Sequence, residues 1–113
     1  VQVQQGEQGL TMSKAFLIMG WEVYIMHSDK LNRFYIGCTR KMEERIQQHL
    51  THFFGEDAFT AKADDWVLKL QLACKDERQA KSVEQHIKKM KSSKYINNLI
   101  QFTEMQERLL SRF

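Results

Sequence analysis

Five polar residues of this chain carry groups that enzymes commonly use, and they follow one another in the order Tyr24, Tyr35, Arg45, His49 and Glu84. Phenol and imidazole groups move protons, a guanidinium binds anions, and a carboxylate binds metal ions. Arg45 and His49 are four residues apart, which puts them on one face of a helix. These residues form a candidate site, provided that the fold brings them together.

Each residue of this set also has a purely structural interpretation. A strand tyrosine usually packs in the core with a satisfied hydroxyl, and Arg45 could pair with a nearby carboxylate such as Glu44. His49 could be an exposed surface histidine. Glu84 and Lys88 are an i, i+4 pair of favourable orientation, which is common and worth only ~0.3 kcal/mol. Taken one by one, these residues leave both interpretations open.

Two short segments of alternating polarity predict a β-hairpin that would carry the tyrosines. Residues 21–27 and 33–37 are β-rich and are joined by a polar turn centred near Asp29. Such a turn would place Tyr24 roughly opposite Tyr35, with both phenols on one face. In the first segment, one face would hold Trp21, Val23 and Ile25 and the other Glu22, Tyr24 and Met26.

The next elements alternate between helix and strand. Thr39 predicts the N-cap of a helix over residues 40–53, and residues 54–65 are typical of a loop. Residues 66–73 predict a third strand, with one face formed by Leu68, Leu70 and Leu72. The apolar stripe of the helix would comprise Met42, Ile46, Leu50 and Phe53.

The last third of the chain predicts helices only. Asp76 and Gln79 form a capping-box pattern before a helix whose stripe would comprise Ala80, Val83, Ile87 and Met90. Ser92 and Ser93 break this helix, and residues 94–101 predict another. Thr103 with Gln106 would cap a short last helix. The order ββαβαα, with this extra C-terminal helix, predicts an α+β fold in which helices flank a small antiparallel or mixed three-stranded sheet.

The length of 113 residues fits one domain. We expect residues 1–14 to be a disordered leader, an expression remnant or translation from an upstream start, and residues 15–101 to form the domain. Residues 102–113 would be a C-terminal helical extension. Its apolar side chains would pack in the core or dock a partner protein or a second copy of the chain; they are Leu109, Leu110 and Phe113.

Composition and motifs exclude several classes of protein. No apolar stretch approaches the ~20 residues of a membrane span, so we expect no membrane association. Cys38 and Cys74 belong to no CxxC pair, which excludes a zinc finger; free thiols in a reducing cytoplasm are the simpler expectation, with a disulfide as the alternative. The motifs GxxxxGK[ST], GxGxxG, HExxH and GxSxG are absent from the chain.

The order of the candidate residues resembles the GIY-YIG nuclease domain. The matching segments are Val23-Tyr24-Ile25, Phe34-Tyr35-Ile36-Gly37, Arg45-x-x-x-His49 and the later helical Glu84. The tyrosines are eleven residues apart, as in the two tyrosine motifs of that family. The resemblance covers residues 21–100 and looks like the small stand-alone bacterial members. The chain departs from the family pattern at Glu22, where the motif has glycine, and at Asp64-Asp65, where proline is common.

This resemblance implies hydrolysis of phosphodiester bonds with one divalent ion, Mg²⁺ or Mn²⁺. Glu84 would hold the metal, since such an ion keeps most of its waters and needs only one or two carboxylates. Tyr24 would orient or deprotonate the attacking water. Its phenol normally has a pKa of about 10, so it would need a neighbouring cation to act as a base. Arg45 would supply that field and bind the phosphate.

The resemblance also assigns supporting roles. Tyr35 and His49 would complete the hydrogen-bond network, with His49 as the alternative base. Gly37 would allow a close approach of the backbone at the strand end, and Thr39 would cap the following helix rather than take part in catalysis.

The charge distribution supports a phosphate-backbone partner. The net charge of +3 is concentrated in residues 78–94, with six cations and one anion, and in residues 30–49, with five cations and two anions. Such patches bind DNA in a salt-dependent, largely sequence-independent way. The predicted nucleic-acid-binding residues are Arg40, Lys41, Lys88, Lys89, Lys91 and Lys94.

The leading hypothesis is therefore a metal-dependent DNA endonuclease with little sequence specificity. One alternative is a non-catalytic nucleic-acid-binding module of the same fold, although a decayed site should have lost some of the five residues. Another is a nuclease subunit that cuts only with a partner protein. Intact duplex, flaps, junctions, damaged DNA and RNA all stay open as substrates.

Overall fold

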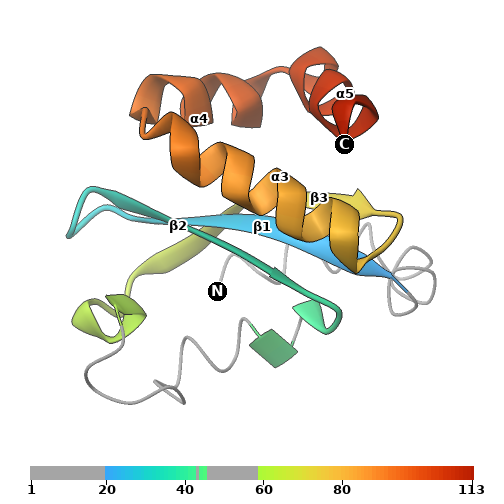
Figure 1. Ribbon diagram of the computed structural model, residues 1–113. Helices are drawn as coiled ribbons and strands as arrows, with labels where there is room; N and C mark the ends of the chain where they lie inside the picture. Colours follow the sequence, from blue (N-terminus) through green and yellow to red (C-terminus); the bar gives the residue numbers. More distant parts are fainter. Residues whose placement is uncertain (1–19, 43, 46–58) are drawn as a thin grey trace.

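The computed structural model describes residues 20–42, 44–45 and 59–113 and contains one three-stranded antiparallel sheet with helices packed on it (Figure 1). The strand order is β2-β1-β3. The elements are β1 (Trp21–Ser28), β2 (Arg33–Thr39), the 3-10 helix η1 (Phe59–Lys62), β3 (Trp66–Cys74), α3 (Glu77–Met90), α4 (Ser93–Gln101) and α5 (Thr103–Arg112). The predicted α+β class is confirmed, and the described elements follow the predicted order; most of the helix predicted over residues 40–53 lies outside the described residues. The short helix η1 lies where a loop alone was expected.

The β1–β2 hairpin has a different register from the predicted one. Tyr24 pairs with Gly37, and Tyr35 pairs with Met26, so the two tyrosines are two residues out of direct opposition. The reason is that Ser28 pairs with Arg33, which centres the turn one position later than expected. The predicted alternation along β1 is confirmed. Both phenols lie on the same face, because Met26, the partner of Tyr35, is two positions from Tyr24 on the same strand.

A β-bulge divides the third strand between the two faces of the sheet. Ile25 pairs with Leu70 and Met26 with Leu68, which leaves Lys69 as the extra residue. An extra residue reverses the side-chain alternation beyond it. Leu68 therefore packs beside Tyr24, while Leu70 packs on the opposite face. The prediction that Leu68, Leu70 and Leu72 share one face is wrong for this reason.

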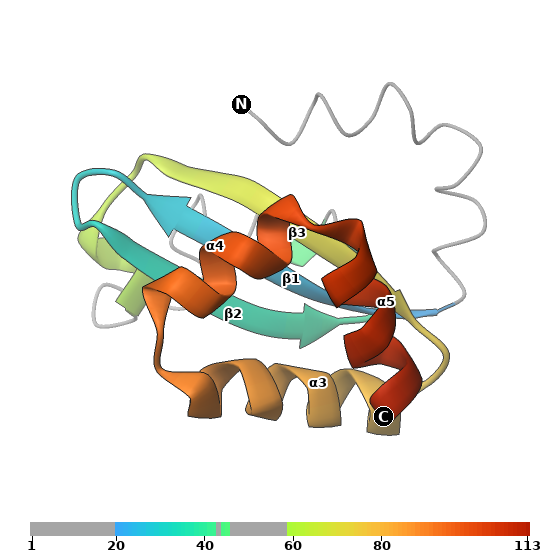
Figure 2. The same ribbon diagram turned by 90° about the horizontal axis from the view of Figure 1, so that it is seen from above.

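Three helices cover the face of the sheet that carries Val23 and Ile25. In Figures 1 and 2, α4 and α5 lie over the sheet and α3 runs along its β2 side. Leu109 of α5 is buried in the same core as Leu99 of α4, and Leu110 packs against that core, whereas Phe113 is 38% exposed. The buried members of this core are Val23, Ile25, Ile36, Leu72, Cys74, Ala80, Val83, Ile87, Ile96, Leu99 and Leu109.

One of the helix caps predicted in the C-terminal part of the chain is confirmed and the other is wrong. Asp76 is the N-cap of α3 and accepts a hydrogen bond from Gln79 N at 2.8 Å, as predicted. Thr103, however, does not cap α5, because Phe102 occupies the N-cap position without a side-chain bond. Gln106 instead donates from Nε2 to the carbonyl oxygen of Leu99 at 2.8 Å. It therefore satisfies the C-terminal end of α4 rather than the start of α5.

Met90 is 42% exposed and does not continue the buried stripe of α3. It is the last residue of the helix, because Lys91 takes up a left-handed conformation with φ 47° and ends it. Both cysteines are free, as expected. Within residues 20–42, 44–45 and 59–113, no helix combines the length and apolar character that crossing a membrane requires.

Asp65 connects the β1–β2 turn to the segment before β3. One of its oxygens accepts a hydrogen bond from Ser28 Oγ at 2.5 Å, and the other accepts one from Lys30 N at 2.9 Å. The neighbouring Asp64 forms an exposed ion pair, with Oδ1 3.0 Å from Lys30 Nζ. The acidic pair that departs from the family pattern thus supplies a structural clamp.

We expect Asp65→Asn to lower the melting temperature clearly at about pH 7, because the amide cannot accept both bonds in the same orientation. The hydrogen bond from Ser28 lowers the folded-state pKa of Asp65 below 3.8, so its contribution is present above that value and is lost as the pH falls. The difference in melting temperature between wild type and variant should therefore be present at about pH 7 and disappear at about pH 2. Asp64→Asn removes the same charge and should have little effect, because exposed ion pairs contribute little. Equal effects of both substitutions would contradict the clamp.

Candidate active site

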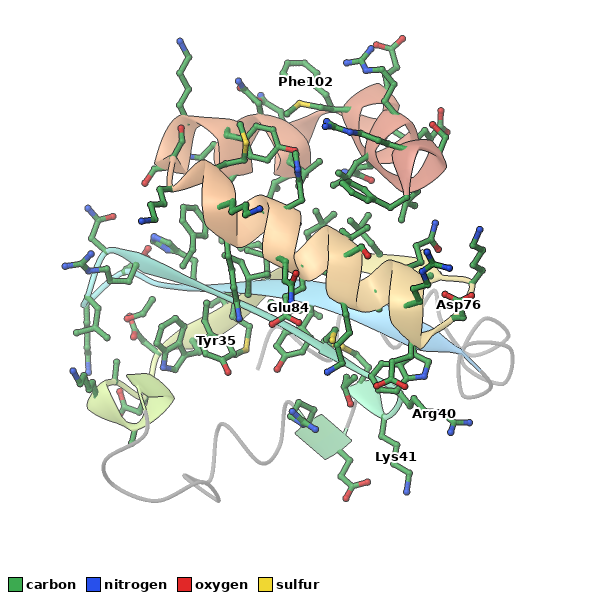
Figure 3. All side chains as sticks on the ribbon, in the orientation of Figure 1. Tyr35, Arg40, Lys41, Asp76, Glu84 and Phe102 are labelled. Atoms are coloured by element: carbon green, nitrogen blue, oxygen red, sulfur yellow. The ribbon has the colours of Figure 1, made fainter. Side chains whose placement is uncertain are left out.

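Glu84 lies on the side of α3 that faces the edge strand β2. It shares this side with Lys81 and Lys88, which are three residues before it and four after it. Lys88 Nζ lies 2.7 Å from Glu84 Oε2, and the Glu84 side chain is only 16% exposed. In Figure 3, Glu84 points from α3 toward the sheet, with Tyr35 on the far side of β2. The ion pair foreseen from spacing is therefore real, but it lies at a largely covered position.

Cys38 holds Glu84 from the sheet side. Burial, followed by a hydrogen bond with Glu84, raises the pKa of the Cys38 thiol to about 12. Cys38 therefore remains a neutral thiol that donates to the carboxylate. Glu84 is thus fixed between a thiol on β2 and an ammonium group on its own helix.

The side chain of Tyr24 packs over Gly37, its pairing partner on the edge strand β2. A Cβ atom built on Gly37 would stand 2.5 Å from Tyr24 Oη and 2.6 Å from Cζ, closer than any real contact. Tyr24 is fully buried, and its ring centroid is 6.3 Å from that of Tyr35. The missing side chain of Gly37 is therefore what allows the phenol to reach the β2 edge. Met26, Met42 and Trp66 complete the cluster around it.

The surroundings of Tyr24 keep its phenol neutral. Burial raises its pKa above the usual value of 10.0, and the charges of Tyr35 and Glu84 raise it further. The positive charge of Arg45 and its hydrogen bond with the phenol lower the pKa but do not outweigh burial. Without an additional cation, Tyr24 therefore donates and accepts hydrogen bonds but does not act as a base.

The edge strand brings together groups that begin on opposite faces of the sheet. Tyr24 belongs to the face away from α3, whereas Glu84 comes from α3 itself. They come within electrostatic reach of each other because β2 is an edge strand, so that α3 can pass beside it and the phenol can reach it across Gly37. Tyr35, Arg45 and Glu84 all act on the pKa of Tyr24. His49 lies outside the described residues.

Thr39 stabilises the turn that leads to Arg45. Its Oγ1 accepts a hydrogen bond from Lys41 N at 3.0 Å, and Arg45 N donates to the carbonyl oxygen of Lys41 at 2.9 Å. Helical structure begins at Met42, two residues later than expected, so Thr39 precedes the helix and is not its N-cap. The predicted N-cap is therefore wrong, although the Thr39 hydroxyl does accept a hydrogen bond from the backbone.

Glu22 occupies a buried polar position on the Tyr24 face. It is 2% exposed, and Gln71 Nε2 donates to its Oε1 at 2.5 Å. Burial raises the pKa of this carboxyl, and the bond from Gln71 opposes that effect. The departure from the tyrosine motif is thus accommodated by a partner from β3.

A family model for the GIY-YIG catalytic domain matches residues 20–97, which is more than half of the chain. The chain belongs to the GIY-YIG family. Comparison with curated proteins and with solved structures found no significant match. GIY-YIG domains are generally nucleases, act on DNA and typically depend on a divalent metal ion.

The cations around this GIY-YIG site fall into two groups. Arg40 and Lys41 are exposed at the end of β2, as Figure 3 shows. Lys88 is bound to Glu84, while the other predicted lysines are exposed near the junction of α3 and α4: Lys89, Lys91 and Lys94.

Reasoning from the sequence did not identify Cys38 and Lys81 as neighbours of the site. The signal for Cys38 was its strand position: it follows Gly37, so its side chain points to the face of the sheet that carries α3. Lys81 is one helical turn before Glu84, so it lies on the same side of the helix.

Proposed function

We propose that this chain is a metal-dependent DNA endonuclease with little sequence specificity. The observation that carries the proposal is that Arg45 is bonded to the Tyr24 phenol at the β2 edge, within electrostatic reach of the Glu84 carboxylate. A carboxylate, a phenol and a guanidinium at one place can bind a phosphodiester and a water together. Membership of the GIY-YIG family supports this chemistry.

The Glu84 carboxylate fits a hard divalent cation such as Mg²⁺ or Mn²⁺. The described residues contain no group of three or more His, Cys, Asp or Glu side chains that could hold a metal ion. A single carboxylate nevertheless suffices for an ion that keeps most of its waters and takes others of its ligands from substrate phosphate. When bound, the ion would stabilise the charge that develops on the phosphate.

The residues of the chain would then bind the phosphate and orient the water. Arg45 presents a planar fork that suits two phosphate oxygens. Tyr24, a neutral phenol, would hold the attacking water by a hydrogen bond, and Tyr35 would support it from the same face. The oxygen of that water would form the new bond to phosphorus while the bond to the leaving ester oxygen breaks, and the proton lost by the water would pass through solvent to the leaving oxygen.

Low sequence specificity follows from the kind of contact that the exposed cations can make. Arg40, Lys41 and the lysines near the α3–α4 junction are suited to phosphates, which position a duplex but carry no base information. Whether the enzyme cuts a duplex, a flap or a junction would depend on how the DNA strand enters the active site.

A nicking assay tests the proposal. Supercoiled plasmid and branched DNA should be cut with Mg²⁺ or Mn²⁺ and left intact with EDTA. Tyr24→Phe should lower the cleavage rate by about 10²-fold or more, because a misplacement of the attacking water by about 1 Å costs a factor of this size. DNA affinity should stay nearly unchanged, because the lost hydroxyl serves the water.

Tyr95→Phe is the matched control, since Tyr95 lies on α4 and packs against His86, away from the site. It should cut like wild type. If the wild-type protein binds DNA but cuts none of these substrates with either metal, the binding-module alternative replaces the proposal. If cutting appears only after a cell extract is added, a partner-dependent subunit replaces it.

A further inference from the structure

A groove with a volume of about 340 Å³ opens beside the candidate active site. It lies between the end of β2, the first residues after it and the first half of α3. Its lining contains four cations and one carboxylate: Arg40, Lys41, Arg45 and Lys81, with Glu44. The rest of the lining is formed by Trp21, Cys38 and Thr39. A concave surface with this excess of positive charge suits an anion.

The groove and the active site share two of their walls. Cys38 lines the groove and bonds to Glu84. Arg45 lines the groove and bonds to Tyr24. Because each strand of DNA carries a phosphate about every 3.4 Å along the axis, a strand with one phosphate at Glu84 brings its next phosphates to the adjoining surface. The groove is therefore where a flanking phosphate would lie.

Besides Arg45, two cations of the groove have defined neighbours. Lys81 Nζ stands 5.8 Å from the centroid of the Trp21 ring, a cation–π distance that keeps the ammonium group at the groove wall. Lys41 Nζ lies 3.9 Å from Glu44 Oε1, an exposed pair that a phosphate can displace at little cost. The apolar ring and the cations together resemble surfaces that bind a nucleic-acid strand.

We propose that this groove binds the phosphodiester next to the one that is cut, on the strand held at Glu84. Lys41 and Lys81 contact that phosphate, and Trp21 holds Lys81 in place and covers the sugar. This inference rests on the proposed function for the identity of the cut phosphate. It adds Lys81 and Trp21 to the DNA-binding surface and gives the bound strand a direction, from Glu84 toward the start of α3.

The test compares two double variants that remove the same charge. Lys41→Gln/Lys81→Gln should weaken binding of a labelled DNA duplex, measured by fluorescence anisotropy in EDTA, by about tenfold or more, and should reduce the salt slope of log Kd by about 2. Lys69→Gln/Arg108→Gln removes two exposed cations from β3 and α5 and should change Kd by less than about threefold. If the two double variants weaken DNA binding equally, the proposal that this groove binds a DNA phosphate is wrong.

A second arm locates the contact. After the cut position has been mapped on a short duplex, the flanking phosphate on each side is replaced in turn by a neutral methylphosphonate. On one side the replacement should weaken wild-type binding but leave the Lys41→Gln/Lys81→Gln variant unaffected, because the contact is already lost. Additive effects on both sides would overturn the proposal. If the wild-type protein binds DNA but never cuts it, the proposed function is wrong. The anisotropy comparison of the two double variants then still tests whether the groove binds a DNA phosphate.

Discussion

Replacing Glu84 with glutamine should lower the rate of DNA cleavage by about 10³-fold or more, because a bound metal contributes several kcal/mol to the transition state and each 1.4 kcal/mol is tenfold. Glutamine keeps the shape of the side chain, and its oxygen can still accept from Lys88 Nζ. The fold should therefore survive. DNA affinity should stay equal or rise, since a negative charge leaves the binding surface. Plasmid nicking and fluorescence anisotropy measure the two quantities separately.

Glu77→Gln provides the matched control on the same helix, in the first turn of α3. It removes the same charge and should leave the cleavage rate within about twofold of wild type, because exposed charges away from the site contribute little. Unchanged cutting by Glu84→Gln would contradict the assignment of the metal to Glu84. A loss of binding equal to the loss of rate would indicate that Glu84 supports the fold rather than catalysis.

The parts of the fold that could be predicted are those that local sequence determines. The alternation along β1 assigned Val23 and Tyr24 to the correct faces, since strand side chains alternate with period two. The Asp76 cap was predicted because its oxygen needs only the backbone of Gln79. Such features depend on neighbours within four residues.

The features that could not be predicted depend on pairing between strands. The register of Tyr24 with Gly37 follows from where the turn is centred, and the bulge at Lys69 follows from how β3 pairs with β1. Nothing in the run of leucines on β3 signals that the alternation reverses there. Gln106 is similar, because its bond to the Leu99 carbonyl depends on how α5 folds back on α4.

The candidate site shows the same division. The residue types came from the sequence, but the neighbourhood of Glu84 and Tyr24 depends on β2 being the edge strand. The contact of Cys38 with Glu84 depends on the same arrangement. A residue order can thus identify a family, while the contacts between its residues follow from the tertiary fold.

Gly37→Ala should both destabilise the protein and slow DNA cleavage. The new Cβ would stand 2.5 Å from Tyr24 Oη and 2.6 Å from Cζ, so the phenol must move away from the β2 edge. Alanine normally improves on a strand glycine by about 0.5–1 kcal/mol, but overpacking a buried site costs about 1–3 kcal/mol. The variant should therefore be less stable. Its cleavage rate should fall by about 10²-fold, as for a misplacement of ~1 Å.

Two comparisons separate this clash from a general loss of stability. Gly20→Ala adds the same methyl group at the start of β1, where the nearest atom, the Cys74 carbonyl oxygen, is 3.5 Å away, so it should keep stability and rate. In a Tyr24→Ala background the ring is gone, and adding Gly37→Ala should then cost no further stability. If Gly37→Ala destabilises both backgrounds equally, Tyr24 does not lie on Gly37. The strand glycine would then serve the backbone alone, and the route by which the phenol reaches Glu84 would be wrong.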